Sequence, residues 1–409
     1  MQRAVTRKEL CGLGLLALLG GASAQLDTVT RNTPRGLLSP KRANRTVHHY
    51  LYVLLENKIY VYDMDAGHRL VQTITLPSMV KFIRGTAADV KSHMLYISYG
   101  SVTSGGSLLK YDFVNHKVIY HKTYRSGIDS FGITPDGKTI YMPDGDGQND
   151  GIWRTVDTAT GDVRGAIDTR GHAAHNTIVS LNGAHVYMGP RLSNYLVVAD
   201  TRTNHVIRKI GPIRNGVRPF TINGAETLAF IETSGFLGFQ VASIATGQIL
   251  YTVPVNGFTF NGFNQFAPSH GISLSPDERE LYISDWPHSY AHVFDVSNLP
   301  RKAPKKVADI KLYSMNGSES PCISTNCMKE GWVLHSRDGR FVYIGDAGDV
   351  IDTATRKSVA YLAPLANTRK FLEIDWANGR PVFATSRYGV GYVTQLRQAR
   401  PSERSPGSG

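Results

Sequence analysis

The sequence predicts an all-β fold, and three observations support this prediction. The 409 residues show no convincing helical period. Two short units, each typical of a β-hairpin, recur along the chain. Their spacing is roughly 45 residues, which is typical of repeat proteins built from small sheets. We therefore expect one large repeat domain of short strands.

The first unit is a Tyr- and Val-rich strand that ends in Asp and leads into a Thr-x-Thr-Gly-like turn. Clear copies are residues 157–161 (DTATG), 200–204 (DTRTN) and 352–356 (DTATR). Asp and Thr side chains bond their own backbone in such turns, while Gly or Asn accepts positive φ. The unit therefore predicts a hairpin between strands that are neighbours in sequence.

The second unit precedes the first and reads as strand, Pro-Asp-Gly-type turn, strand. Copies are residues 132–141 (GITPDGKTIY), 271–277 (GISLSPD) and 333–343 (VLHSRDGRFVY). Together the two units form four short antiparallel strands per repeat. Such repeats close into a β-propeller around a central channel, because radial closure removes the exposed edges of an open array.

This pattern of SPD(G), LYI, VFD and TG elements resembles the YVTN-type propeller repeats, which are related to the lactonase-like propellers. The resemblance covers residues 48–396 and is specific for the fold. It implies little about function, because propellers of this kind host hydrolases, lyases, electron-transfer partners and binding modules.

Seven blades are expected, with eight as the alternative. Seven innermost strands are predicted to start near Arg84, Asp129, His175, Val217, His270, Gly331 and Phe371. The segment 50–76 is interpreted as three outer strands and 370–396 as inner strands. We expect these two ends of the propeller to join in one closing blade.

The first 24 residues are typical of a secretory signal. Arg3, Arg7 and Lys8 precede an apolar run that ends at a small-residue cleavage site before Gln25. A twin-arginine route is an alternative to the general one. The sequence therefore predicts a secreted or periplasmic protein without a membrane span, with disordered segments at 25–47 and 397–409.

The net charge of +12 and the pI near 9.5 favour anionic ligands. Lys and Arg are dispersed through the repeats, which argues against a nucleic-acid partner. We expect a monomer with a small anionic or sugar-like ligand. Two cysteines, Cys322 and Cys327, remain after signal removal and are expected to form a local disulfide, with free thiols as the alternative.

Propeller sites usually lie at the channel mouth where the innermost strands begin. Counting along the repeats places Arg84, Asp129, His175, Arg218 and His270 at equivalent positions there. His175 and His270 are candidate general bases or ligands of a divalent metal ion, and the other three are candidate ligand-binding residues. The alternative is that these side chains bond neighbouring carbonyls or waters and keep the channel wet.

Two long insertions enter innermost strands of adjacent blades. The first, 255–269, carries Phe263 among alternating Phe and amide residues, which suit stacking on a sugar. The second, 313–330, carries the cysteines and leads to Trp332. Phe263 and Trp332 are therefore further candidate ligand-binding residues. His48 and His49, at the first strand, are interpreted as edge surface.

These features lead to two functional hypotheses. The first is a propeller that binds a small anionic or carbohydrate-derived ligand at the channel mouth. This site is either catalytic, as a lactonase-like hydrolase or a His- or metal-assisted carbohydrate lyase, or it only binds. The second is a non-catalytic scaffold that binds a protein or a cell-wall polymer on a blade rim.

Overall fold

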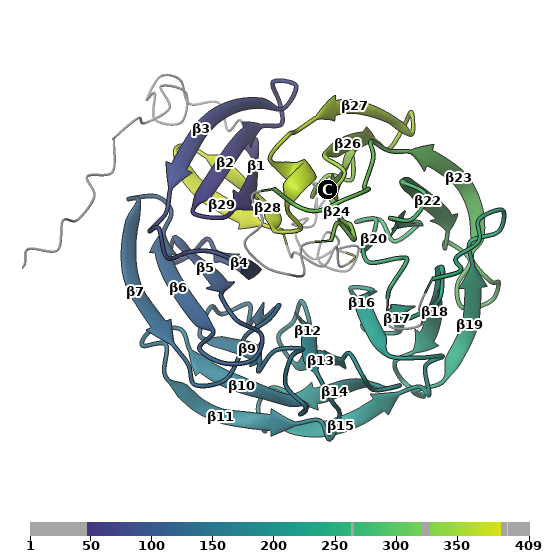
Figure 1. Cartoon of the computed structure of the whole chain (residues 1–409), viewed down its shortest axis with the longest axis horizontal. Helices are drawn as coiled ribbons and strands as arrows, with labels where there is room; N and C mark the ends of the chain where they lie inside the picture. Colours follow the sequence, from purple (N-terminus) through teal and green to yellow (C-terminus); the bar gives the residue numbers. More distant parts are fainter. Residues whose placement is uncertain (1–46, 263–265, 321–327, 386–390, 392–409) are drawn as a thin grey trace, which may run out of the picture. The chain divides into compact units, whose positions relative to one another are not determined.

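Seven antiparallel sheets surround a central channel in the part of the chain that this computed structural model describes, residues 47–262, 266–320, 328–385 and 391 (Figure 1). Each sheet forms one blade, and six of them have four strands. The prediction of a seven-bladed propeller is confirmed, and the eight-bladed alternative is wrong. The expected signal, the tail and residues 25–46 of the expected linker lie outside the described residues, whereas Val47 begins β1.

Blades 1 to 3 follow each other along the chain. Blade 1 contains β4 (Ile83–Asp89), β5 (Met94–Tyr99), β6 (Ser107–Asp112) and β7 (Lys117–Thr123). Blade 2 contains β8 (Gly132–Ile133), β9 (Thr139–Pro143), β10 (Ile152–Asp157) and β11 (Val163–Asp168). Blade 3 contains β12 (Ala174–Val179), β13 (His185–Pro190), β14 (Leu196–Asp200) and β15 (His205–Ile210).

Blades 4 to 6 repeat the same arrangement. Blade 4 contains β16 (Val217–Ile222), β17 (Leu228–Thr233), β18 (Gly238–Ser243) and β19 (Ile249–Pro254). Blade 5 contains β20 (Ile272–Leu274), β21 (Glu280–Asp285), β22 (Tyr290–Asp295) and β23 (Lys305–Lys311). Blade 6 contains β24 (Trp332–His335), β25 (Phe341–Gly345), β26 (Asp349–Asp352) and β27 (Lys357–Tyr361).

Blade 7 joins the two ends of the propeller. Its strands are β28 (Phe371–Ala377), β1 (Val47–Leu55), β2 (Lys58–Asp63) and β3 (Arg69–Thr75), with β29 (Arg380–Ala384) as a fifth strand beside β28. β1 pairs with β28 along its length, and the Thr368 hydroxyl donates to the Leu54 carbonyl at 2.7 Å. Closure therefore links strands that are more than 300 residues apart.

The hairpin turns form as their residue types require. In blade 3 one carboxylate oxygen of Asp200 accepts from the backbone N–H groups of Arg202 and Thr203, each at 2.9 Å. Asn204 completes the turn with a φ of 57°, a conformation that Asn tolerates better than most residues. The Asp-Thr-x-Thr unit is thus the turn between the third and fourth strands of a blade.

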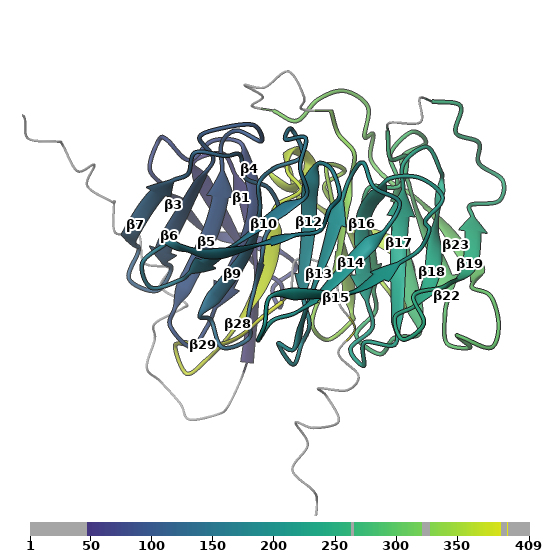
Figure 2. The same cartoon turned by 90° about the horizontal axis from the view of Figure 1, so that it is seen from below.

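The channel has two mouths, because the strands run between the two ends of the ring (Figure 2). We call the end where the innermost strands begin the upper mouth and the opposite end the lower mouth. The innermost strand β12 is buried along most of its length, while the outermost strand β15 is exposed along most of its length. In the described part of the chain helical structure is limited to the short 3₁₀ helix η1 (Leu365–Asn367), and no helix there is long and apolar enough to cross a membrane.

Candidate functional site

Each blade brings one ionisable side chain to the upper mouth, at or just before the start of its innermost strand. In blade order these residues are Arg84, Asp129, His175, Arg218, His270, Glu330 and Lys370. The repeat geometry places them around one opening because equivalent positions of the blades face the common axis. The sequence had nominated the first five of them.

His175 and His270 lie beside each other, with their ring centroids 6.2 Å apart. The Asn176 amide donates to Nδ1 of His175 at 2.9 Å, so Nε2 carries the proton and faces the Asp129 carboxylate at 3.9 Å. Nδ1 of His270 donates to the Gly331 carbonyl at 3.3 Å. Burial lowers the pKa of His270 to about 4, although nearby Glu330 opposes this shift. His270 is therefore neutral at pH 7.

Asp129 is a buried carboxyl group at the base of this mouth. Burial, followed by the neighbouring Asp146 carboxylate, raises the pKa of Asp129 to about 7, while Arg84 and Lys370 act in the opposite direction. Such a group changes protonation near neutral pH, which general acid–base chemistry requires. It is the strongest candidate for proton transfer at the upper mouth.

Asp129, Asp146 and His175 each offer one ligand atom within 4.8 Å of the others. One imidazole and two carboxylates fit a divalent ion such as Zn²⁺ or Mn²⁺. The sequence paired His175 with His270 as metal ligands, whereas this set, drawn from the described residues, contains His175 without His270. Arg191 already contacts the Asp146 carboxylate at 3.4 Å and competes with a metal for that group.

A buried ion cluster borders the two histidines. The Arg369 guanidinium contacts Glu330 at 2.6 Å, Glu319 at 3.1 Å and Asp346 at 3.4 Å. Burial opposes ionisation of Glu330, but His270, Arg369 and Arg218 outweigh it and lower its pKa to about 2. Glu330 is therefore ionised. All three carboxyl groups share the Arg369 guanidinium, and burial, followed by Glu319, raises the pKa of Asp346 to about 7.

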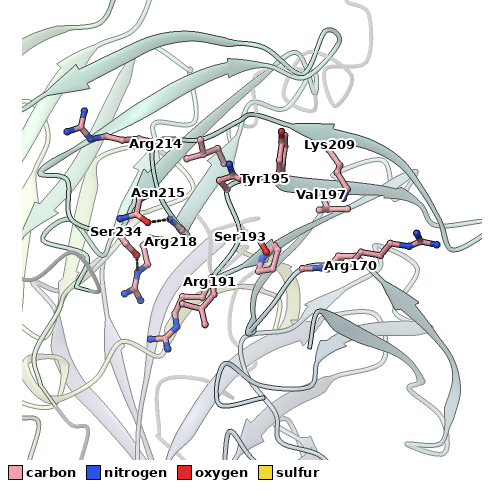
Figure 3. Close-up of a pocket in the computed structure, with 17 residues that line it drawn as sticks. Arg170, Arg191, Ser193, Tyr195, Val197, Lys209, Arg214, Asn215, Arg218 and Ser234 are labelled. Atoms are coloured by element: carbon pink, nitrogen blue, oxygen red, sulfur yellow. Dashed lines mark hydrogen bonds between the residues drawn. The ribbon is translucent and has the colours of Figure 1, made fainter. Parts of the chain in front are cut away.

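A cavity of about 840 Å³ lies between blades 3 and 4 near the upper mouth (Figure 3). Five basic side chains line it: Arg170, Arg191, Lys209, Arg214 and Arg218. None of the described residues that line it is acidic. The Nε–H of Arg218 donates to the Ser234 hydroxyl at 2.7 Å, and burial lowers its pKa to about 10. We call this cavity the cationic pocket.

Two further nominated residues, Arg84 and Trp332, do not line the cationic pocket. Arg84 is half-buried, and its Nε–H points to the Gly100 carbonyl at 3.5 Å. Trp332 is 2% exposed and packs edge-on against the His270 ring, so it supports that ring from the core. Phe263, Cys322 and Cys327 lie outside the described residues. The neighbouring Phe258 packs against His288 and His292 of blade 5, and it does not line the cationic pocket.

Several residues of this mouth were missed by sequence reasoning, among them Asp146, Arg191 and Asp346. All three follow the second strand of a blade, on the hairpin that returns to the third strand. Those hairpins end at the same mouth as the starts of the innermost strands. Counting forward from the Leu/Ile-Tyr pair of each second strand, as well as backward, would have found them.

No protein-family model matches the sequence, and no curated protein matches it. Among solved structures, the chain is similar to one from Kuenenia stuttgartiensis hydrazine synthase, with 17% identity and a TM-score of 0.50. The similarity covers 66% of this chain and 76% of that one. At this identity the similarity supports the fold alone, and the YVTN family itself stays a prediction. The chain is a seven-bladed β-propeller.

Proposed function

We propose that this chain is an exported propeller that binds a small anionic, sugar-derived ligand, of the uronate type, in the cationic pocket beside the upper mouth. The observation that carries the proposal is the charge of the pocket wall. Five basic side chains line the pocket without an acidic one among the described lining residues. A pocket of one sign attracts ligands of the opposite sign.

The buried guanidinium of Arg218 is the expected anchor for the ligand. Burial disfavours its positive charge, Glu330 and Asp146 favour the charge, and Arg191 disfavours it. A bound carboxylate would favour the charge further because it accepts two parallel N–H bonds from a guanidinium. The anion is therefore expected to bind at the inner end of the pocket.

The rest of the wall suits the hydroxyl groups of a sugar. Ser193, Asn194, Asn215 and Ser234 provide hydroxyl and amide groups, and Tyr195 provides an aromatic ring. A volume of about 840 Å³ lies within the usual range for small-ligand sites. Charge at one end and neutral polar groups around it favour a sugar acid over a simple inorganic anion.

Calorimetric titration with glucuronate tests this proposal. Arg218→Gln should weaken binding roughly 10- to 100-fold, since a hydrogen bond to a charged group contributes about 1.5–3 kcal/mol. Arg202→Gln is the matched control, because Arg202 is exposed on a hairpin at the lower mouth. Equal affinities of the wild type and Arg218→Gln, or no binding of any sugar acid by the wild type, would overturn the proposal.

Acid–base turnover of the bound ligand is a second candidate function. It is favoured by the Asp129 carboxyl, whose pKa of about 7 suits proton transfer, and by the protonated Nε2 of His175 at 3.9 Å. Opening of a lactone and elimination from a uronate both need a proton moved at the reacting centre. Asp129 and His175 could supply that step at the upper mouth, beside the cationic pocket.

A panel of lactones and uronate oligosaccharides tests turnover. Asp129→Asn should lower kcat by about 100-fold or more, and the pH profile should lose a limb near pH 7. His270→Ala should have a smaller effect, since His270 is neutral and bonded to the Gly331 carbonyl. If Asp129→Asn turned the ligand over at the wild-type rate, a role of Asp129 in proton transfer would be excluded.

A further inference from the structure

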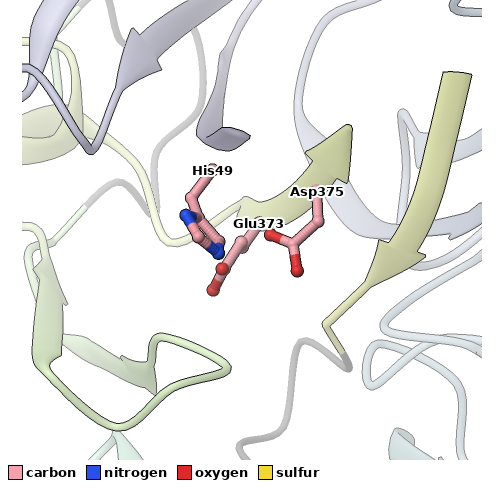
Figure 4. Close-up of side chains that lie close together, drawn as sticks. All are labelled: His49, Glu373 and Asp375. Atoms are coloured by element: carbon pink, nitrogen blue, oxygen red, sulfur yellow. The ribbon is translucent and has the colours of Figure 1, made fainter. Parts of the chain in front are cut away.

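A second cluster of side chains that could hold a metal ion, His49, Glu373 and Asp375, lies at the lower mouth, and none of the three lines the cationic pocket. Figure 4 shows these side chains. His49 on β1 is paired directly with Asp375 on β28. Directly opposite residues of two antiparallel strands share a face, and residues two apart on one strand do as well. His49, Asp375 and Glu373 therefore project to the same side of blade 7.

The two carboxyl groups of this cluster are completely buried, and each has one oxygen engaged. The backbone N–H of Arg337 donates to Oε2 of Glu373 at 2.7 Å, and its guanidinium donates to Oδ2 of Asp375 at 2.9 Å. The second oxygens, Oε1 of Glu373 and Oδ1 of Asp375, accept no hydrogen bond from another described residue, and the two carboxyl groups interact only with each other on this side. Two buried acceptors without donors are costly unless a ligand engages them.

The imidazole of His49 is held in the orientation that a metal ligand needs. Its Nδ1 lies 2.9 Å from Oδ1 of Asp65, which leaves Nε2 available to the cluster. Figure 4 shows the ring directed at the two carboxylates. In metal sites a ligating His usually donates its other ring N–H to a carboxylate, which fixes the ring. Asp65 occupies that position here.

The cluster borders a cavity of about 540 Å³ between blades 5, 6 and 7. His49, Asp375 and Arg337 belong to its wall. One ligand atom from each of His49, Glu373 and Asp375 lies within 4.8 Å of the others. A cation bound there would have three protein ligands and would direct its open positions to the cavity.

We propose that His49, Glu373 and Asp375 bind one divalent transition-metal ion of the Zn²⁺ class at the lower mouth. One imidazole with two carboxylates matches ligand sets that hold Zn²⁺. Ca²⁺ takes six to eight oxygen ligands, and Mg²⁺ prefers an all-oxygen octahedron, so both fit less well. Asp65 acts as a positioning residue through His49. The site does not depend on the anion pocket.

The test is calorimetric titration of the chelator-treated, dialysed full chain with ZnCl₂. We expect one ion per chain, loss of binding in Glu373→Gln, and affinity about 10- to 100-fold weaker in Asp65→Asn. His48→Gln is the matched control, because His48 neighbours His49 on β1 but projects to the other face. Zn²⁺ binding that Glu373→Gln leaves unchanged, or that Asp129→Asn abolishes instead, would overturn the proposal.

A folding control keeps this test decisive. Saturating ZnCl₂ should raise the Tm of the wild type and of His48→Gln, because a ligand that binds only the folded state stabilises it. The Tm of Glu373→Gln and of His49→Gln should not respond to Zn²⁺. If one of these two variants does not fold, the other supplies the result. A Zn²⁺-dependent Tm rise that persists in both would contradict the site.

Discussion

The two mouths of the channel differ in how their buried charged groups are paired. At the upper mouth, Arg369 contacts three carboxylates, and the cationic pocket beside it carries an excess of positive charge. At the lower mouth, Glu373 and Asp375 share one arginine and keep two oxygens without donors in the described residues. The ligands that we propose for the two mouths therefore carry opposite charges.

The two mouths differ in charge pairing because different segments of the chain form them. The connections between blades are long and vary in length, and they bring Glu319, Glu330 and Arg369 to the upper mouth. The lower mouth is built from short hairpins within blades. There, charged groups come from the strands, such as Glu373 and Asp375, and from the hairpin turns, such as Arg337 and Asp65.

Removal of the central cation should damage the upper mouth most. Arg369→Met leaves Glu319, Glu330 and Asp346 without their shared partner, so we expect a loss of about 3–5 kcal/mol in the free energy of unfolding. Urea denaturation measures it. The control is Arg164→Met, an exposed residue paired with Asp157, which should cost less than about 1 kcal/mol. Equal losses in the two variants would contradict the account of the upper mouth.

Acid should weaken the upper mouth through His270. Its pKa is lowered from 6.5 to about 4, so the unfolded chain takes up a proton that the folded chain excludes. The stability that this group contributes is complete above pH 6.5 and is lost as the pH falls toward 4, a change of about 3 kcal/mol. Urea denaturation at several pH values should show a shallower acid loss for His270→Gln. Parallel curves for the two proteins would count against the buried neutral imidazole.

The lower mouth should respond to pH in the opposite direction in metal-free protein. Burial, then the charge of Asp375, raises the pKa of Glu373, so the stability from this group is complete below pH 4.5 and is lost as the pH rises. Glu373→Gln should gain on the wild type between pH 5 and pH 8, by on the order of 1 kcal/mol. Thermal denaturation in chelator measures this gain. If the difference in stability between Glu373→Gln and the wild type stayed constant from pH 5 to pH 8, ionisation of Glu373 would not destabilise the folded protein.

The sequence could predict the ring and most of one mouth. The Asp-Thr-x-Thr and Pro-Asp-Gly turns identify strand pairs that are local in sequence, and the hairpin at Asp200 forms as expected. Comparison of equivalent positions in the repeats then predicts that His175 and His270 lie at the same mouth, and their rings do lie side by side. Both steps succeed because they use only the regularity of the repeat.

The parts that could not be predicted depend on contacts between distant segments. The interpretation of His49 as edge surface is wrong, because β1 pairs with β28 on one side and with β2 on the other. Arg369 contacts Glu319 and Glu330 across blades through connections that have no counterpart in the repeat. No spacing rule relates such residues, since their positions follow from how irregular loops pack.

The most direct test of the account measures both ligands on the same variants. Tm values of the wild type, Arg218→Gln and Glu373→Gln are recorded with glucuronate and, separately, with ZnCl₂ after chelator treatment. We predict that Arg218→Gln loses only the response to glucuronate and that Glu373→Gln loses only the response to Zn²⁺. A variant that loses both responses, or variants that keep both, would contradict the assignment of opposite charges to the two mouths.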